Sequence, residues 1–178
     1  MTVTGARAQL VDAAERLFAE HGIAGVSLRE VGAAAGQRNN SAAQYHFGDK
    51  DGLVAAIFER RMTPIDRRRR ALLAESDGSV ASLVRAVVEP LHRAPARYRR
   101  FLQQLSLADP QLTALGALDR PEMAGLKDAF ERLDAALAAR GLRADTRGER
   151  LRLLGVLAVH APPSPLFVDT LVALLEAP

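Results

Sequence analysis

The sequence predicts an all-α protein in two parts, from its composition and from the spacing of its apolar residues. Hydrophobic residues make up 48% of the 178 residues, yet aromatic residues are only 4% and Trp is absent. The core must therefore be built from Leu, Ala and Val, and runs of β-branched residues are scarce. Gly and Pro also stand where helical patterns begin and end. A chain of this length can bury one core, or a small domain and a second one of about a hundred residues.

The composition excludes several classes of protein. The absence of Cys rules out disulfides and thiolate metal sites. The amino terminus lacks a signal-peptide pattern, and no run approaches the roughly 18 apolar residues of a membrane span. We therefore expect a cytoplasmic protein that makes no membrane contact. The net charge is only +3, so charge alone does not indicate a nucleic-acid partner.

The first helix is expected from about Ala6 to His21. Gly22 follows the last residue of this pattern and is a typical left-handed C-cap. The apolar positions recur at helical spacing and form a single stripe, which comprises Leu10, Ala13, Ala14, Leu17 and Phe18.

A second, short helix is expected from Leu28 to Ala35. Ser27 and Glu30 have the S-x-x-E spacing of a capping box, which marks the start of this helix. Gly36 marks its end.

A third helix is expected to start near Asn39 or Asn40, both of which are good N-cap residues, and to end at about Tyr45. Ala42 and Ala43 permit close packing of neighbouring helices. Two short helices joined by a tight turn, the second with small polar residues at its start, suit the insertion of a helix end into the major groove of DNA.

A long helix is expected from Lys50 to about Glu75. Pro64 should kink or break it near residues 61–63. The best linker follows, at Glu75–Ser79. The predicted division is a domain at 1–50, a connecting helix at 50–75 and a second domain at 76–178.

The second domain is expected to be helical throughout, with helices near 80–93, 95–107, 121–140, 145–161 and 165–176. The last two are apolar on nearly every side, and such a helix must be buried on two sides. A central core helix explains one of them but less easily both. We therefore expect these two helices to form a two-fold interface with a second copy of the chain.

The segments AAERLFAEHG, SLREVGAAAG and YHFGDKDGLV resemble the TetR family of bacterial transcriptional regulators over roughly residues 6–60. The most specific feature is Tyr45-His46-Phe47 followed by Lys50 and Leu53. One departure concerns the turn: family members commonly have nine residues between the glycine that ends the second helix and the Phe, and this chain has ten. We expect the extra residue to lie before Ser41.

The resemblance implies an N-terminal three-helix helix-turn-helix DNA-binding domain, followed by a helical ligand-binding and dimerisation domain. It implies a sequence-specific transcriptional regulator, a repressor, that binds a palindromic double-stranded operator. Binding would be as a homodimer held through the helices near 145–161 and 165–176. An unidentified small-molecule effector would release the DNA, and no cofactor is implied.

The resemblance also assigns residues to roles. Candidate contacts to base edges are Arg38, Asn39, Asn40 and Gln44. Candidate contacts to the DNA backbone are Ser27, Arg29, Ser41, Tyr45, His46 and Lys50. From their apolar or amphipathic character, and not from the resemblance, Tyr98, Phe101, Leu105 and Met123 are candidate ligand-pocket residues, although core packing is the favoured role for each.

Other interpretations stay open at this point. The asparagines could serve only as helix caps, and Tyr45 could be half-buried in the core. The arginine runs at 67–70 and 97–100 are interpreted as solvated surface. The rival functions are a helical small-molecule or partner-binding module without specific DNA binding, and an architectural DNA binder without sequence preference.

No catalytic or metal-binding site is predicted. The sequence has no GxSxG, Walker or dinucleotide-binding motif, and its four His residues lack metal-ligand spacing. An enzyme is therefore the least favoured class.

Overall fold

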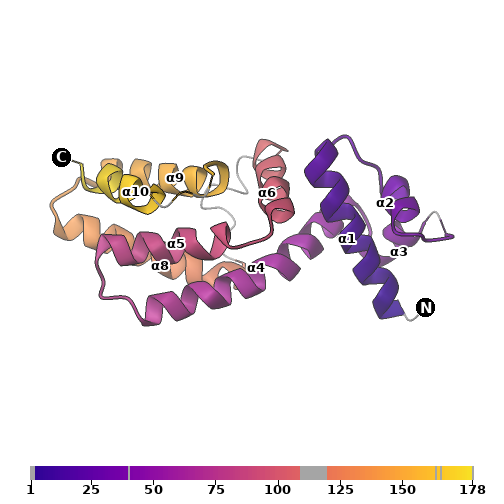
Figure 1. Cartoon of the computed structure of the whole chain (residues 1–178), viewed down its shortest axis with the longest axis horizontal. Helices are drawn as coiled ribbons and strands as arrows, with labels where there is room; N and C mark the ends of the chain where they lie inside the picture. The colour runs from indigo at the N-terminus through magenta and orange to yellow at the C-terminus, as the bar shows by residue number, and fades with distance from the viewer. Residues whose placement is uncertain (1–2, 40, 109–119, 163, 165, 178) are drawn as a thin grey trace. The chain divides into compact units, whose positions relative to one another are not determined.

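The computed structural model describes residues 3–39, 41–108, 120–162, 164 and 166–177, and each regular element in these ranges is a helix (Figure 1). The chain divides into two compact units. Unit 1 comprises Met1–Arg61 and Pro95–Asp109, and unit 2 comprises Met62–Ala94 and Pro110–Pro178. The described helices are α1 (Val3–His21), α2 (Leu28–Ala34), α3 (Ala42–Phe47), α4 (Lys50–Ala74), α5 (Val80–His92), α6 (Ala96–Ala108), η2 (Pro121–Met123), α8 (Ala124–Ala139), α9 (Ala144–His160) and α10 (Phe167–Glu176).

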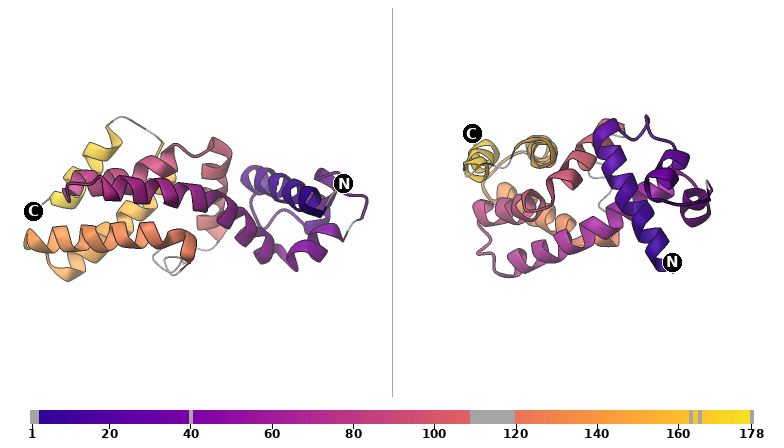
Figure 2. Two further views of the ribbon diagram at one scale, coloured as in Figure 1. Left: turned by 90° about the horizontal axis from the view of Figure 1, so that it is seen from below. Right: turned by 45° about the vertical axis from the view of Figure 1, so that its right-hand side comes forward.

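Helix α1 organises unit 1, where it packs against α2, α3 and α6 (Figures 1 and 2). Its predicted stripe is buried at Leu10, Ala14 and Phe18. The ring of Phe18 stacks on Phe101 of α6, with 6.4 Å between the ring centroids. Gly22 ends the helix with a φ of 76°, as its C-cap role requires.

The sequence predicts that residues 95–107 belong to the second domain, whereas the structure groups α6 with the first helices. The reason is the apolar face of α6. Tyr98 and Phe101 are fully buried, their rings stack with centroids 5.8 Å apart, and Phe18 of α1 continues the stack.

The connection from α3 to α4 depends on a glycine. A Cβ atom at Gly52 would collide with the backbone carbonyl of Phe47, so a residue without a side chain is required. Asp49 stabilises the same turn, because its carboxylate accepts the Gly52 N–H at 2.8 Å.

Helix α4 continues through Pro64 without interruption, so of the two expected outcomes, a kink or a break, the break is wrong. A proline in a helix removes one hydrogen bond, here the one to the carbonyl of Arg60. The side chains of Met62 and Ile65 on either side of it are buried, and this packing stabilises the helix against that loss. The boundary between the two units falls in the same stretch, between Arg61 and Met62.

Unit 2 is built around α5, which contacts α8, α9 and α10. Eight residues of α5 are buried. One is Pro90, and the other seven are Val, Leu or Ala. The ends of α5, α8, α9 and α10 lie within a few residues of the predicted ones, because Pro and Gly mark them in the sequence.

A buried carboxylate links α4 to the start of α8 within unit 2. Asp66 is 1% exposed and accepts hydrogen bonds from Arg69 Nη1 at 2.8 Å and Arg70 Nε at 3.0 Å. It also accepts the backbone N–H groups of Gly125 and Leu126, at 2.9 and 3.1 Å. The prediction that residues 67–70 are all solvated is therefore wrong for Arg69, which is 2% exposed.

No helix among the described residues has the length and apolar character that crossing a bilayer requires. Within the same residues, His, Asp and Glu side chains form no group of three or more that could hold a metal ion.

Candidate nucleic-acid interface

Helices α2 and α3 pack against each other through small buried residues. Val31 and Gly32 of α2 are buried, as are Ala42 and Ala43 of α3. Because the inner faces carry no bulky side chains, the two short helices approach closely and also contact α1. This packing holds α3 in place and leaves its opposite face free for contacts.

The outer face of α3 carries polar side chains. Ser41, Gln44 and Tyr45 are all exposed, and Tyr45 is 83% exposed. The alternative in which Tyr45 is half-buried in the core is therefore wrong. A phenol and an amide presented this way can donate to phosphate and to base edges respectively.

Helix α3 begins at Ala42, two or three residues after the predicted start. Ser41 occupies the N-cap position without making a side-chain cap bond. Asn39 organises the turn instead, because its side-chain Oδ1 accepts the Ser41 N–H at 2.9 Å and its carbonyl accepts the Ala42 N–H at 3.1 Å. Asn40 lies outside the described residues.

The predicted capping box of α2 is present and uses the donors of Ser27. Glu30 accepts both the backbone N–H and the hydroxyl of Ser27, each at 2.7 Å, and its own N–H donates to the hydroxyl oxygen. The Ser27 side chain, followed by its backbone N–H, lowers the pKa of Glu30 through these bonds. Ser27 is exposed, but it would have to leave Glu30 to donate its hydroxyl to a phosphate.

Lys50, a predicted phosphate contact, has a structural role in the fold. Its Nζ donates to the carbonyls of Ile23 and Ala24, at 2.9 and 3.2 Å, and thereby ties the start of α4 to the turn before α2. An ammonium has three donors, so the third remains for a phosphate.

The remaining predicted residues lie around this face. Arg29 and Arg38 are exposed, and His46 is half-buried with its ring edge against Tyr45. Phe47 is half-buried, and the guanidinium of Arg7 lies 5.1 Å from its ring centroid. Arg7 is a basic residue of this region that no pattern in the sequence indicates.

The candidate ligand residues are buried in helix packing. Tyr98, Phe101 and Leu105 lie in unit 1 and Met123 lies in unit 2, where all four side chains are nearly inaccessible. None of them lines a pocket of unit 2 that is formed by α5, Arg93, Ser164 and α10.

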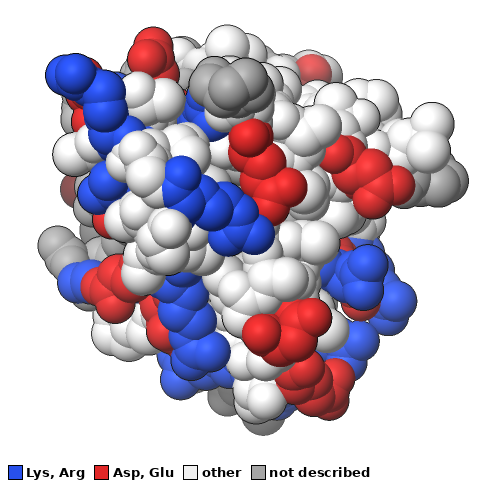
Figure 3. Space-filling view, turned by 90° about the vertical axis from the view of Figure 1, so that its left-hand side faces the viewer, with Lys and Arg blue, Asp and Glu red and all other residues white. Residues whose placement is uncertain are grey.

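Elsewhere on the surface, charges of both signs are interspersed. Figure 3 shows a face of the molecule on which Lys and Arg alternate with Asp and Glu around uncharged side chains. Such a face offers no continuous basic stripe to a DNA backbone.

Comparisons with known proteins match the helix-turn-helix segment and most of the chain. Residues 10–57 match the model of the family described as bacterial regulatory proteins, TetR family. The HTH-type transcriptional repressor KstR2 of Rhodococcus jostii is 30% identical over 183 residues, which cover 94% of this chain and 85% of that protein. The HTH-type transcriptional regulator BetI of Paraburkholderia xenovorans is 30% identical over 157 residues, which cover 82% of this chain and 80% of BetI.

Solved structures share the fold. A HlyIIR mutant protein superposes with a TM-score of 0.66 at 15% identity, covering 99% of this chain and 100% of that one. SmeT, the repressor of the Stenotrophomonas maltophilia multidrug efflux pump SmeDEF, is 27% identical, with a TM-score of 0.53 and coverage of 95% and 85%. The multidrug binding protein EbrR, complexed with ethidium, is also 27% identical, with a TM-score of 0.55 and coverage of 96% and 95%.

Proposed function

Because the chain belongs to the TetR family and is a DNA-binding transcriptional regulator, we propose that it represses by binding a palindromic operator as a homodimer. Helix α3 of each copy enters the major groove, and the two copies read half-sites about one helical turn apart. A small molecule bound in unit 2 favours a state of the dimer that no longer fits the operator. The observation that carries the proposal is the polar, exposed outer face of α3 above a buried alanine face.

The chemistry of this face supports a division of roles. Gln44 and Asn39 offer amides that pair with adenine edges, and Arg38 offers a guanidinium that pairs with guanine. The contacts that position the protein on the DNA backbone come from Tyr45 and Lys50. Ser27, Arg29, Asn40, Ser41 and His46 complete the proposed contact set.

The dimer is proposed to form through α9 and α10. Leu153 and Val156 of α9 are 41% and 45% exposed, which is unusual for two large aliphatic residues on one face of a helix. Ala173 of α10 is exposed as well. A second copy covering these side chains would remove this apolar area from water.

The proposed release mechanism requires the ligand to bind one state of the dimer more tightly than the other. The coupling free energy equals that difference in binding free energy, typically about 1–3 kcal/mol. Helix α4 is the proposed lever, because it belongs to both units and has Pro64 beside the boundary between them.

The direct test is an electrophoretic mobility shift assay with an operator found by genome-wide mapping of bound sites. Gln44→Ala is expected to weaken operator binding by about 1–3 kcal/mol and to relax the preference at one base pair. Its affinity for unrelated DNA should not change. Equal affinity of the parent and the variant for the operator would place α3 elsewhere on the duplex.

A second pair of variants tests the backbone contacts. Lys50→Ala should weaken binding to all DNA sequences alike and should reduce the salt dependence of the affinity by about one phosphate contact. Because Lys50 also holds the Ile23 carbonyl, Tyr45→Phe is the cleaner companion, since it deletes only an exposed hydroxyl. Tyr45→Phe should weaken binding to all DNA sequences without altering the salt dependence of the affinity.

The same assay separates the rival functions. Absence of any shift at low salt supports a module that binds small molecules or partners without DNA. Similar affinity for all sequences supports an architectural binder.

The dimer interface has a test of its own. The double variant Leu153→Glu, Val156→Glu should be monomeric by analytical ultracentrifugation and should lose operator binding. A dimeric double variant would exclude the proposed interface.

A further inference from the structure

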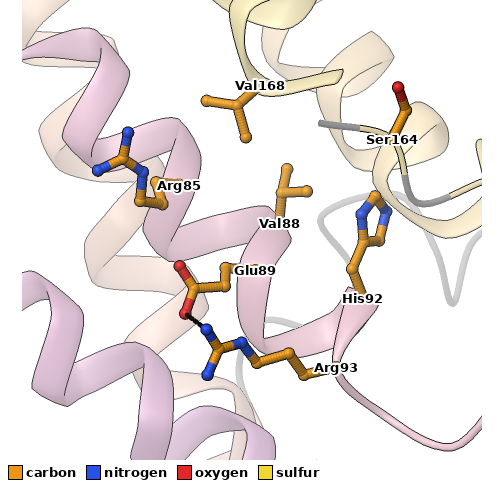
Figure 4. A pocket seen from close by; sticks show the side chains of 7 residues that line it. All are labelled: Arg85, Val88, Glu89, His92, Arg93, Ser164 and Val168. Carbon is orange, nitrogen blue, oxygen red and sulfur yellow. Dashed lines mark ion pairs between the residues drawn. The ribbon is translucent and has the colours of Figure 1, made fainter. Parts of the chain in front are cut away.

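A pocket of about 360 Å³ opens in unit 2 between α5 and the start of α10. Its lining residues are Arg85, Val88, Glu89, His92, Arg93, Ser164 and Val168. Figure 4 shows Val88 and Val168 across from each other in the middle, Arg85 at one end, and His92 with Ser164 at the other. The middle of the pocket is therefore apolar and its ends are polar.

The charges of the pocket are not balanced. Its one carboxylate, Glu89, is held by Arg93 at 3.2 Å and by Arg68 at 3.4 Å. Arg85 has no ion-pair or hydrogen-bond partner among the described residues, and it is exposed. The pocket therefore presents an uncompensated guanidinium beside an apolar surface, whereas its carboxylate is already neutralised.

The apolar surface is built into the fold. Val88 is 1% exposed and belongs to the core of α5, and Val168 is half-buried on α10. The ring of His92 stacks on Phe167, with 5.1 Å between the centroids, which fixes the wall at the far end. Ser164 Oγ accepts the Leu166 N–H at 3.3 Å, so its hydroxyl hydrogen can point to a bound molecule.

We propose that this pocket binds a small organic carboxylate and that this molecule is the effector of the regulator. The carboxylate pairs with Arg85 through two parallel N–H···O bonds, a geometry that the planar guanidinium favours. The apolar body of the ligand lies between Val88 and Val168. The effector role rests on the proposed function, whereas the binding chemistry does not.

The same arrangement disfavours cationic ligands. A cation would have to compete with Arg93 and Arg68 for Glu89 and would lie close to Arg85. Neutral analogues of the same shape would keep the apolar contacts but lose the ion pair. Charge is therefore the property by which this pocket selects among ligands of similar size.

Isothermal titration calorimetry of the full chain with octanoate tests the proposal, with octanamide and octylammonium as neutral and cationic probes of the same length. Octanoate should bind at least about 10-fold more tightly than either. Arg85→Gln should abolish this advantage. Arg67→Gln, which removes the same charge from an exposed position of α4 in the same unit, should leave octanoate binding unchanged.

A second variant, expected to strengthen octanoate binding, shows that a loss of binding in Arg85→Gln is not a folding defect. Glu89→Gln removes the negative charge of Glu89, the one carboxylate among the described lining residues, and should strengthen octanoate binding by about 3-fold. Equal binding of octanoate and octanamide, tighter binding of octylammonium, or an unchanged affinity in Arg85→Gln would each overturn the proposal.

A mobility shift assay with the same variants separates this inference from the proposed function. If octanoate binds through Arg85 but the protein shifts no DNA, the proposed function fails and the binding site stands. If the protein binds the operator but octanoate binding does not depend on Arg85, the proposed binding site is wrong and the proposed function stands. Octanoate that binds through Arg85 without altering operator affinity would overturn its effector role.

Discussion

Among the described residues, each unit contains one buried carboxylate that holds two arginines, and these carboxylates differ in what else they contact. In unit 1, Glu15 of α1 is fully buried and accepts Arg61 Nε at 2.7 Å and Arg97 Nε at 3.1 Å, which joins α1, α4 and α6. In unit 2, Asp66 holds Arg69 and Arg70 and also accepts two backbone N–H groups at the start of α8.

The two clusters differ in Arg69, which is 2% exposed, and not in Arg70, which is 57% exposed like the arginines of unit 1. The side chains of Arg61 and Arg97 are 23% and 41% exposed, so water can replace Glu15 as their partner. Arg69 is buried together with Asp66, and the N–H groups of α8 are fixed in the backbone. The comparison indicates that the cluster of unit 2 is a rigid part of its core, while the cluster of unit 1 is a junction that can exchange partners.

The largest effect is expected for Asp66→Asn, which removes the charge of a buried carboxylate that is ion-paired with the buried Arg69. Loss of one partner of a buried ion pair costs about 3–5 kcal/mol. Denaturant unfolding followed by circular dichroism measures the change. Glu131→Gln, an exposed carboxylate on α8, is the matched control and should change stability by less than about 0.5 kcal/mol.

Gly125→Ala tests how tightly the Asp66 cluster is packed. The new Cβ would lie 2.8 Å from Asp66 Oδ1 and 2.8 Å from the Cγ of Arg70, so the carboxylate would have to move. A cost of about 1–3 kcal/mol is expected, as for other overpacked sites. A neutral or stabilising result, as alanine normally gives in a helix, would show that the cluster adapts and would weaken the comparison.

A smaller loss is expected for Glu15→Gln, about 1–2 kcal/mol, because Arg61 and Arg97 can turn to water and only charged hydrogen bonds are lost. Glu20→Gln, which removes an exposed carboxylate from the same helix, is the control. If Glu15→Gln destabilises the protein more than Asp66→Asn does, the comparison is reversed.

The smallest effect concerns an exposed carboxylate outside both clusters. Hydrogen bonds from the Ser79 side chain, and next from its backbone N–H, lower the pKa of Asp77 from 3.8 to about 2 at the start of α5. Because the folded-state pKa is the lower one, the stabilisation is present above about pH 3.8 and is lost as the pH falls towards 2. In Asp77→Asn, the free energy of unfolding should therefore change less with pH between about 2 and 3.8. The same pH dependence in the variant and the parent would contradict this role of Asp77.

Local signals predicted the helices and much of the candidate site. The capping box of Ser27 and Glu30, the C-cap at Gly22 and the exposed face of α3 follow from patterns that span a few residues. The start of α3 was predicted too early, because the sequence shows that Asn39 can cap a helix but not that its side chain turns back to the Ser41 N–H.

Contacts between distant segments could not be predicted in this way. Glu15 and Arg97 are 82 residues apart, and Asp66 and Gly125 are 59 apart, so no periodicity relates them. For the same reason the sequence predicted a solvated run at 67–70 and gave no sign that Arg85 would lie beside Val168. A charged residue on a helix is expected to face water unless a partner from elsewhere in the chain meets it.

By itself, the sequence determined the helical class, the ends of most helices and the polar tip of α3, since these depend on neighbouring residues and on hydrogen bonds within a few turns. The tertiary structure alone decided that α6 packs with α1, that α4 runs through Pro64, and which carboxylates and arginines are buried. These outcomes depend on which distant side chains exclude water together, and that is settled only when the helices pack.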